Sequence, residues 1–169
     1  MAENEEELSL PEGVDPQDVL VLDTTPGRIL IKLNTDVAPG HAERLKLLAR
    51  EGYYDDVPFH RVIEGFMAQT GDGQYGNGTG GSSYPDLKAE FSDLPFVRGV
   101  VGMARKGGNN HSANSQFFIM FEDGDFLNGE YTVIGEVVDG MDIVDRLKRG
   151  EPPANPDRIV TMKVAADLD

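Results

Sequence analysis

Two short apolar runs, residues 59–63 and 66–70, hold the side chains with the clearest chemical potential in this chain. The first run contains Arg61, the second contains Gln69, and Gly65 separates them. If the chain folds back at this glycine and the runs pair as antiparallel strands, Arg61 lies opposite Gln69 on one face. The pattern predicts a guanidinium held by an amide beside apolar side chains, which suits binding of an apolar ring and its neighbouring carbonyl. Those apolar neighbours are Phe66 and Met67.

A second segment, residues 115–121, also combines an amide side chain with aromatic and other apolar residues, as the two runs around Gly65 do. Strand alternation places Gln116, Phe118 and Met120 on one face and apolar residues on the other. In a plain core strand, Gln116 would be a polar group on an apolar face, and a buried amide needs hydrogen-bond partners. An open groove would supply such partners, so this face also indicates a binding site.

Other motifs point to little chemistry. Residues 76–81 match the Gly-x-Gly-x-x-Gly spacing of a dinucleotide site, but the following residues do not favour the helix that such a site requires. A flexible rim loop is the better interpretation. The three histidines are scattered without zinc-ligand spacing, and His60 is expected to pack within a strand. We therefore expect no metal and no cofactor.

The elements that must position these residues are mostly short strands. Strands are predicted at 19–22, 28–33, 96–103, 115–121, 131–138 and 159–165, besides the two runs around Gly65. A helix is predicted from Pro39 to about Glu51, and a second helix is predicted with Asp139 as its cap and Gly150 after its end. The expected fold is mainly β, with a helix near each end. The pattern by itself leaves a barrel and a sandwich open.

Composition limits the partners. The chain has 169 residues, a formal net charge of -15 and no cysteine, which suits one domain without disulfides. Residues 1–18 supply seven acidic side chains and no basic ones, and are predicted to form an acidic, flexible arm before a globular domain at 19–169. The acidity argues against nucleic-acid binding, and the sequence has no membrane span and no basic-then-apolar signal. We expect a cytoplasmic monomer.

The chain resembles the cyclophilin family of peptidyl-prolyl cis-trans isomerases, and Phe126 and Tyr131 resemble its bacterial cytoplasmic branch. The resemblance extends from about residue 19 to residue 164. It implies a closed eight-stranded antiparallel β-barrel capped by two α-helices. The matching segments are 59–63, 65–67, 71–72, 77–81, 102–104, 114–119 and 127–129, together with Gln69.

The resemblance also implies roles for individual residues. Arg61 resembles the catalytic arginine, and Gln69 resembles the residue that orients it. Ala104 and Gln116 resemble contacts to the peptide backbone, and the nearby rim is formed by Asn77 and Gly78. The wall of the proline pocket corresponds to Phe66, Met67, Phe118 and Leu127.

Three further positions in the expected substrate site depart from the best-known eukaryotic pattern. Phe126 replaces a tryptophan, Tyr131 replaces a histidine, and Arg105 replaces an asparagine. Phenylalanine lacks the N–H donor of tryptophan, so we expect weak cyclosporin binding with isomerase activity retained. Arg105 lies where the substrate backbone is expected to pass.

The expected function is isomerisation of Xaa-Pro peptide bonds in proline-containing peptides and unfolded protein clients. A non-catalytic module that binds proline peptides on the same barrel is the main alternative, and Arg61 favours the enzyme. A small-ligand barrel would leave the set of Arg61, Gln69 and Gln116 unexplained.

Overall fold

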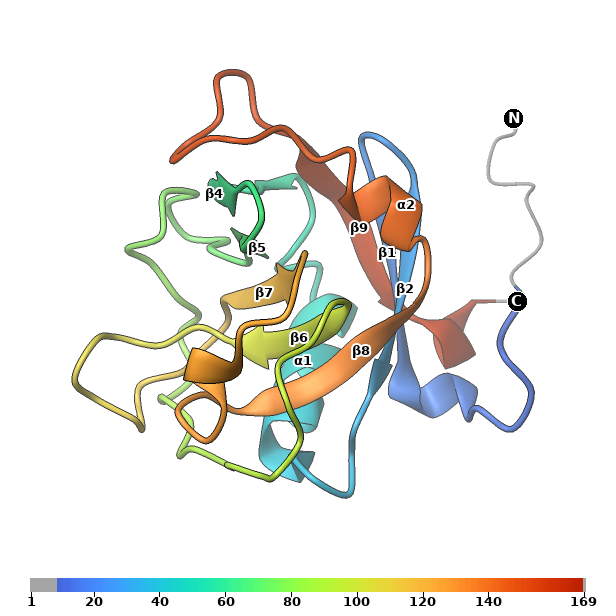
Figure 1. The fold of residues 1–169 in the computed structure, drawn as a ribbon. Helices are drawn as coiled ribbons and strands as arrows, with labels where there is room; N and C mark the ends of the chain where they lie inside the picture. Colours follow the sequence, from blue (N-terminus) through green and yellow to red (C-terminus); the bar gives the residue numbers. More distant parts are fainter. Residues whose placement is uncertain (1–8, 169) are drawn as a thin grey trace.

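The computed structural model describes residues 9–168, and in that range the strands form one curled antiparallel sheet (Figure 1). The strand order is β3-β9-β1-β2-β8-β6-β7-β5-β4. The strands are β1 (Val19–Thr24), β2 (Arg28–Leu33), β3 (Val57–Pro58), β4 (Arg61–Ile63), β5 (Met67–Thr70), β6 (Val100–Met103), β7 (Phe117–Met120), β8 (Val133–Asp139) and β9 (Arg158–Val164). Two α-helices, α1 (Pro39–Arg50) and α2 (Met141–Val144), and the short 3-10 helices η2 (Pro16–Asp18), η3 (Asp125–Leu127) and η4 (Ala165–Asp167) complete the described elements.

The expected closed eight-stranded barrel is wrong in strand number and in closure. Among the described residues the sheet has nine strands, and its two edge strands, β3 and β4, are not paired with each other. β3 is only two residues long and ends at Pro58, which has no N–H to donate to a neighbouring strand. Phe59 and His60 join β3 to β4, and the sheet forms a curled half-barrel.

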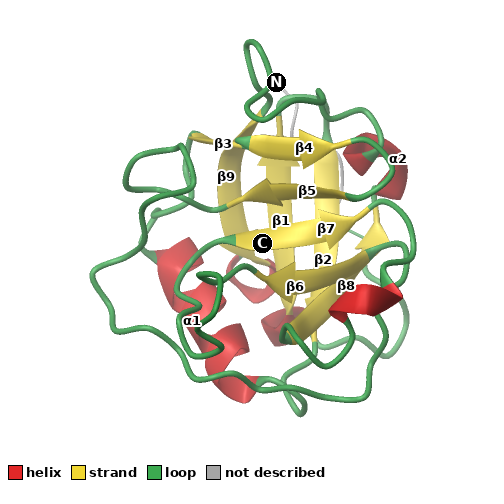
Figure 2. Ribbon diagram, turned by 60° about the vertical axis from the view of Figure 1, so that its left-hand side comes forward, coloured by secondary structure: helices red, strands yellow, loops and turns green. Residues whose placement is uncertain are grey.

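The two hairpins predicted from turn signals are confirmed. β1 pairs with β2 across the turn at Gly27, and β4 pairs with β5 across the turn at Gly65. Strands predicted at 96–103, 115–121 and 131–138 are present but shorter or shifted, because their ends belong to loops that surround the site. In Figure 2, strands β4, β5, β7 and β6 lie side by side in that order.

The first helix is also confirmed, whereas the second is shorter than expected. Helix α1 begins at Pro39, and its predicted apolar stripe of Ala42, Leu45, Leu48 and Ala49 is buried and packs toward β9. Asp139 does not cap α2. It is the last residue of β8, and Gly140, with a φ of 93°, takes the cap position because this left-handed conformation favours glycine.

The sheet separates two apolar clusters that follow strand alternation. Phe117, Ile119 and Phe121 point into the large core that α1 covers, whereas Phe118 and Met120 join a smaller cluster on the opposite face. This division agrees with the period of two predicted for residues 115–121. The smaller cluster forms the base of the candidate site.

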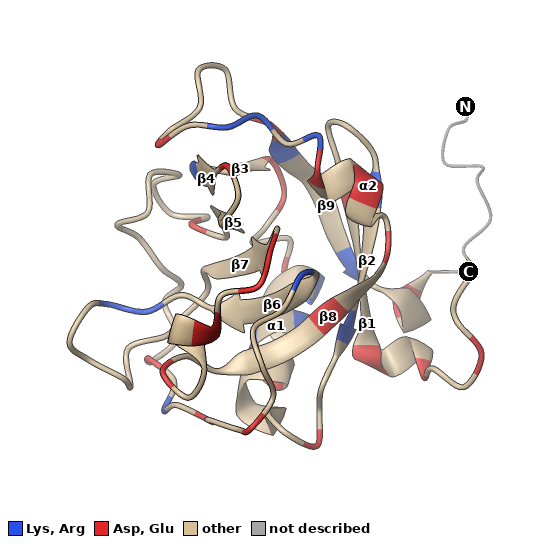
Figure 3. Ribbon diagram, viewed as in Figure 1, with Lys and Arg blue, Asp and Glu red and all other residues tan. Residues whose placement is uncertain are grey.

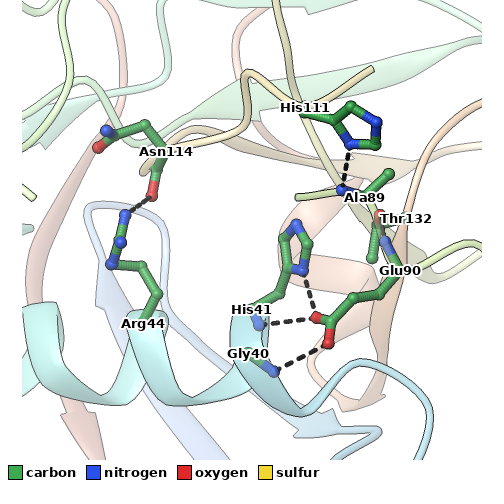
Figure 4. Close-up of polar contacts among 8 residues, drawn as sticks. All are labelled: Gly40, His41, Arg44, Ala89, Glu90, His111, Asn114 and Thr132. Carbon is green, nitrogen blue, oxygen red and sulfur yellow. Dashed lines mark hydrogen bonds and ion pairs between the residues drawn. The ribbon is translucent and has the colours of Figure 1, made fainter. Parts of the chain in front are cut away.

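A histidine and a glutamate join α1 to the loop before β6 (Figure 4). The Glu90 carboxylate accepts hydrogen bonds from the backbone N–H groups of Gly40 and His41, at 3.1 and 3.0 Å, and from Nδ1 of His41 at 2.5 Å. His41 is fully buried and its Nε2 has no partner within the described residues. Burial lowers the pKa of His41, so the ring is neutral and donates from Nδ1 to the carboxylate.

Acidic positions are spread over loops, helices and strands of the described chain, including the middle of β8 (Figure 3). Residues 1–8 of the predicted acidic arm lie outside the described residues. In the rest of that segment, Leu10 and Val14 pack against a small cluster that includes Val19 and Leu30. None of the helices in residues 9–168 has the length and apolar character needed to cross a membrane.

Candidate functional site

The β4–β5 hairpin positions the two residues that the sequence pairs. Arg61 lies opposite Gln69 in the ladder, and Nη1 of Arg61 donates to Oε1 of Gln69 at 3.3 Å. Gly65 permits the turn because its φ of 76° is a conformation that other residues rarely adopt. The predicted register and the predicted arginine–amide contact are both confirmed.

Gln69 in turn contacts the residue at the start of β7. Nε2 of Gln69 donates to Oε1 of Gln116 at 3.0 Å. Nε2 of Gln116 then donates to the backbone carbonyls of Gly78 and Gly80, both at 3.0 Å. Gln116 therefore has the polar partners that its place beside an apolar face requires. The result is a continuous relay of hydrogen bonds from the glycine-rich loop to Arg61.

Asp72 fixes the glycine-rich loop. Its carboxylate accepts five backbone N–H groups: Oδ1 binds those of Gln74 and Tyr75, and Oδ2 binds those of Asn77, Gly78 and Gly80. Burial of the Asp72 carboxyl raises its pKa, but the hydrogen bonds from the loop together lower it further, so the pKa lies below its ordinary value. A single buried anion therefore holds the loop that supports Gln116.

A pocket of about 300 Å³ lies beside Arg61. Eleven of the thirteen residues predicted for the site line it, which brings together parts of β4, β5, β7 and four separate loops. They are Arg61, Phe66, Met67, Gln69, Asn77, Gly78, Ala104, Arg105, Phe118, Leu127 and Tyr131. The base of the pocket is apolar, since Met67, Phe118 and Leu127 belong to the smaller core cluster.

Gln116 and Phe126, the other two predicted residues, lie at its borders. Gln116 lines an adjoining hollow of about 370 Å³ that shares Gln69, Gly78, Ala104 and Arg105 with the first pocket. Phe126 is 68% exposed and does not line the pocket. Its ring instead packs on Phe66, with centroids 5.6 Å apart, so Phe126 supports the pocket wall from outside.

Arg105 and Tyr131 form one wall as a pair. The guanidinium of Arg105 lies 4.3 Å from the centroid of the Tyr131 ring, and Nε and Nη2 donate to the carbonyl of Glu130. Tyr131 packs edge-on against Phe118 at 5.8 Å. Arg105 is therefore held along the rim, where it leaves the apolar base of the pocket open.

Three residues near the site were missed by reasoning from sequence. His60 lines the pocket although it was predicted only to pack, and it is indeed 7% exposed. Asp72 was seen only as part of a matching segment, although an aspartate before a glycine-rich loop is a known acceptor for backbone N–H groups. Glu151, which contacts Arg61, is 90 positions away and had no local signal.

The arrangement offers one kind of chemistry. A charged donor, Arg61, lies at the edge of a pocket that has an apolar base and a size that suits a small ring, and the neighbouring amide of Gln69 holds that donor in place. Such a site can bind an apolar ring and donate a hydrogen bond to an atom beside it.

Comparison with known proteins agrees with this description. Residues 19–164 match the family model for cyclophilin type peptidyl-prolyl cis-trans isomerase/CLD. A protein of Brucella suis named "Probable peptidyl-prolyl cis-trans isomerase" is 54% identical over 170 residues, covering 92% of this chain and 86% of the relative. A Rhizopus delemar protein named "Peptidyl-prolyl cis-trans isomerase-like 1" is 36% identical over 157 residues, covering 90% and 93%.

Solved structures give the same result. The cyclophilin AquaCyp293 from Hirschia baltica superposes with a TM-score of 0.85 at 28% identity, over 92% of this chain and 77% of that one. A Cryptosporidium parvum cyclophilin, crystallised in the presence of the dipeptide Ala-Pro, gives 0.79 at 27% identity, over 86% and 98%. The chain therefore belongs to the cyclophilin family and is a peptidyl-prolyl cis-trans isomerase.

Proposed function

We propose that Arg61 is the catalytic residue of this isomerase and that its substrates are Xaa-Pro bonds in flexible or unfolded segments. The observation that carries the proposal is the Arg61 guanidinium, held by Gln69 beside a pocket of about 300 Å³ whose base is apolar. The Ala-Pro dipeptide named with the Cryptosporidium parvum cyclophilin supports a proline-containing ligand.

The reaction needs no bond to break. Amide resonance gives a rotation barrier of roughly 18–20 kcal/mol, and uncatalysed exchange takes tens to hundreds of seconds. An acceleration of about 10⁵-fold requires a reduction of only ~7 kcal/mol in that barrier. Binding that favours the twisted amide is sufficient.

Arg61 can supply part of that preference. Twisting the C–N bond localises a lone pair on the proline nitrogen, which becomes a better acceptor for a guanidinium N–H. The arginine then binds the twisted form more strongly than the planar form, as catalysis requires. A hydrogen bond to a charged group contributes on the order of 1.5–3 kcal/mol. The pocket residues hold the ring while the carbonyl side turns, and this positioning contributes the remainder.

The test is cis/trans exchange of a short Ala-Pro peptide, followed by NMR exchange spectroscopy. Arg61→Ala is expected to reduce the catalysed rate by at least about tenfold, given the loss of one charged hydrogen bond. Arg146→Ala is the matched control. Arg146 is an exposed arginine that does not line the pocket, and its contact is with Asp142, at 3.9 Å. Undiminished exchange in a folded Arg61→Ala protein would refute the arginine-centred mechanism.

The same experiment separates the enzyme from a proline-peptide binding module. Binding without accelerated exchange in the wild-type protein would favour the module. Retention of Arg61 beside the pocket favours the enzyme, since a group directed at the twisted amide adds little to simple binding.

Weak cyclosporin binding is a further part of the proposal. Phe126 has no N–H to donate and packs on Phe66 at the border of the pocket. We expect Phe126→Trp to tighten cyclosporin binding, measured by titration calorimetry, while exchange of the Ala-Pro peptide stays close to wild type. Tight binding by the wild-type protein would contradict this view.

In the cell, we propose a monomeric cytoplasmic enzyme that assists protein folding. The expected result is sedimentation at the mass of one 18.4 kDa chain and recovery of the protein in the cytoplasmic fraction. Catalysis of a refolding phase limited by proline isomerisation, lost in Arg61→Ala, would support the role in folding. The absence of that catalysis would restrict the enzyme to other flexible substrates.

A further inference from the structure

The Arg61 guanidinium has a second protein partner besides Gln69. Nε of Arg61 donates to Oε1 of Glu151 at 3.3 Å, while Nη1 donates to Gln69 at the same distance. Within residues 9–168, Nη2 has no hydrogen-bond partner. Because the guanidinium is a rigid planar fork, two fixed nitrogens determine the orientation of the third.

The backbone places Glu151 beside Arg61. The loop between α2 and β9 reaches over β4 (Figure 1), and Gly150 and Val62 exchange two backbone hydrogen bonds of 2.8 Å. Gly150 cannot be replaced easily, because an added Cβ would lie 2.5 Å from Cα of Pro153. Each residue of the contact therefore directly adjoins a residue of this bridge: Arg61 precedes Val62, and Glu151 follows Gly150.

A second anchor holds the same loop. Nε of Arg149 donates to the Glu64 carboxylate at 2.8 Å, and its guanidinium lies 4.3 Å from the centroid of the Phe121 ring. Arg149 thus fixes the loop to the β4–β5 turn on the other side of Gly150. The position of Glu151 follows from these anchors, so its contact with Arg61 does not depend on a freely moving loop.

The ion pair contributes little to stability. The side chains of Arg61 and Glu151 are 44% and 57% exposed, and pairs at such positions are weakened by water and salt. The contact has a larger effect on the orientation of the Arg61 guanidinium, because an exposed arginine with several rotatable bonds otherwise samples many positions. A carboxylate on Nε reduces that freedom and leaves Nη2 available to substrate.

We propose that Glu151 is a positioning residue for the isomerase reaction, which holds the Arg61 guanidinium with its Nη2 edge free. The proposal rests on the proposed role of Arg61. Glu151 touches no reacting atom and acts only through the arginine. Its removal should therefore lower kcat and leave KM close to wild type, since the apolar pocket that binds the proline ring is unchanged.

The experiment compares Glu151→Ala, Glu151→Gln and Glu136→Gln by NMR exchange spectroscopy over a range of peptide concentrations. Loss of one exposed charged contact predicts an approximately threefold lower kcat for Glu151→Ala. Glu151→Gln should recover part of the loss, because its amide oxygen can accept from Nε. Glu136→Gln removes the same charge from an exposed position of β8, where the side chain has no hydrogen bond or ion pair to Arg61 or to the loop of Glu151 within residues 9–168, and should match wild type.

A spectroscopic measurement separates positioning from a general structural effect. The Nε–Hε resonance of Arg61, observed in a ¹⁵N correlation spectrum, should shift in Glu151→Ala and stay unchanged in Glu136→Gln. Wild-type kcat with an unshifted resonance in Glu151→Ala would overturn the proposal, as would a higher kcat. If Arg61→Ala itself retains full activity, the proposed function fails; if it does not, a null result for Glu151→Ala rejects only the positioning role.

Discussion

Asp72→Asn tests whether the relay behind Arg61 depends on one buried carboxylate. Asp72 is 1% exposed, and its two oxygens accept two and three backbone N–H groups. An asparagine has the same shape, but its amide nitrogen is a donor. In either orientation of the amide, at least two N–H groups of the loop would face a donor and lose their acceptor.

The expected cost follows from those lost bonds. A hydrogen bond to a charged group contributes about 1.5–3 kcal/mol, and movement of the loop toward water recovers part of it. We therefore expect Asp72→Asn to lower the free energy of unfolding by about 2–4 kcal/mol. Activity should fall as well, because Gly78 and Gly80 supply the carbonyls that hold Gln116. Loosening this support by ~1.4 kcal/mol would lower the rate about tenfold.

The assay is urea unfolding at several pH values, together with exchange of the Ala-Pro peptide. The pKa of Asp72 lies below its ordinary value of 3.8, so the folded protein binds fewer protons than the unfolded chain in the acid range. The stabilisation is fully present above the unfolded pKa and is lost as the pH falls through the folded pKa. The difference in free energy of unfolding between wild type and Asp72→Asn should therefore be large at pH 7 and should shrink as the pH falls below 3.8, the ordinary pKa of an aspartate.

Asp93→Asn serves as the control, since Asp93 is an exposed aspartate of the loop before β6. Its substitution should leave unfolding and exchange unchanged. The reasoning is refuted if the free energy of unfolding of Asp72→Asn at pH 7 lies within about 0.5 kcal/mol of the wild-type value, which is the range typical of neutral surface changes.

Two other substitutions test the site and the helix. Gln69→Leu keeps the volume of the side chain but removes the acceptor for Arg61 and the donor to Gln116, so an approximately tenfold loss of kcat/KM is expected; wild-type exchange rates would show that the relay is dispensable. Burial lowers the pKa of His41 below its ordinary value of 6.5, so wild-type stability should decline as the pH falls below 6.5 toward the folded pKa. His41→Gln should flatten that part of a urea stability profile, and an unchanged slope would contradict it.

The centre of the site can be predicted from the sequence. The register of Arg61 against Gln69 follows from two apolar runs of similar length around one glycine, because a tight turn fixes which residues face each other. The two faces of residues 115–121 follow from the strand period of two. Both inferences rest on local geometry, which a short stretch of sequence encodes.

The contacts that support that centre depend on the packing of segments that are distant in the sequence. The nine-stranded open sheet depends on pairings between strands far apart in the sequence, such as β1 with β9, and the five hydrogen bonds to Asp72 depend on the path of a loop without a repeating pattern. The contact between Arg61 and Glu151 joins residues 90 positions apart. Such contacts arise when separate segments pack against one core, and the side-chain periodicity of each segment carries no information about which distant loop will meet it.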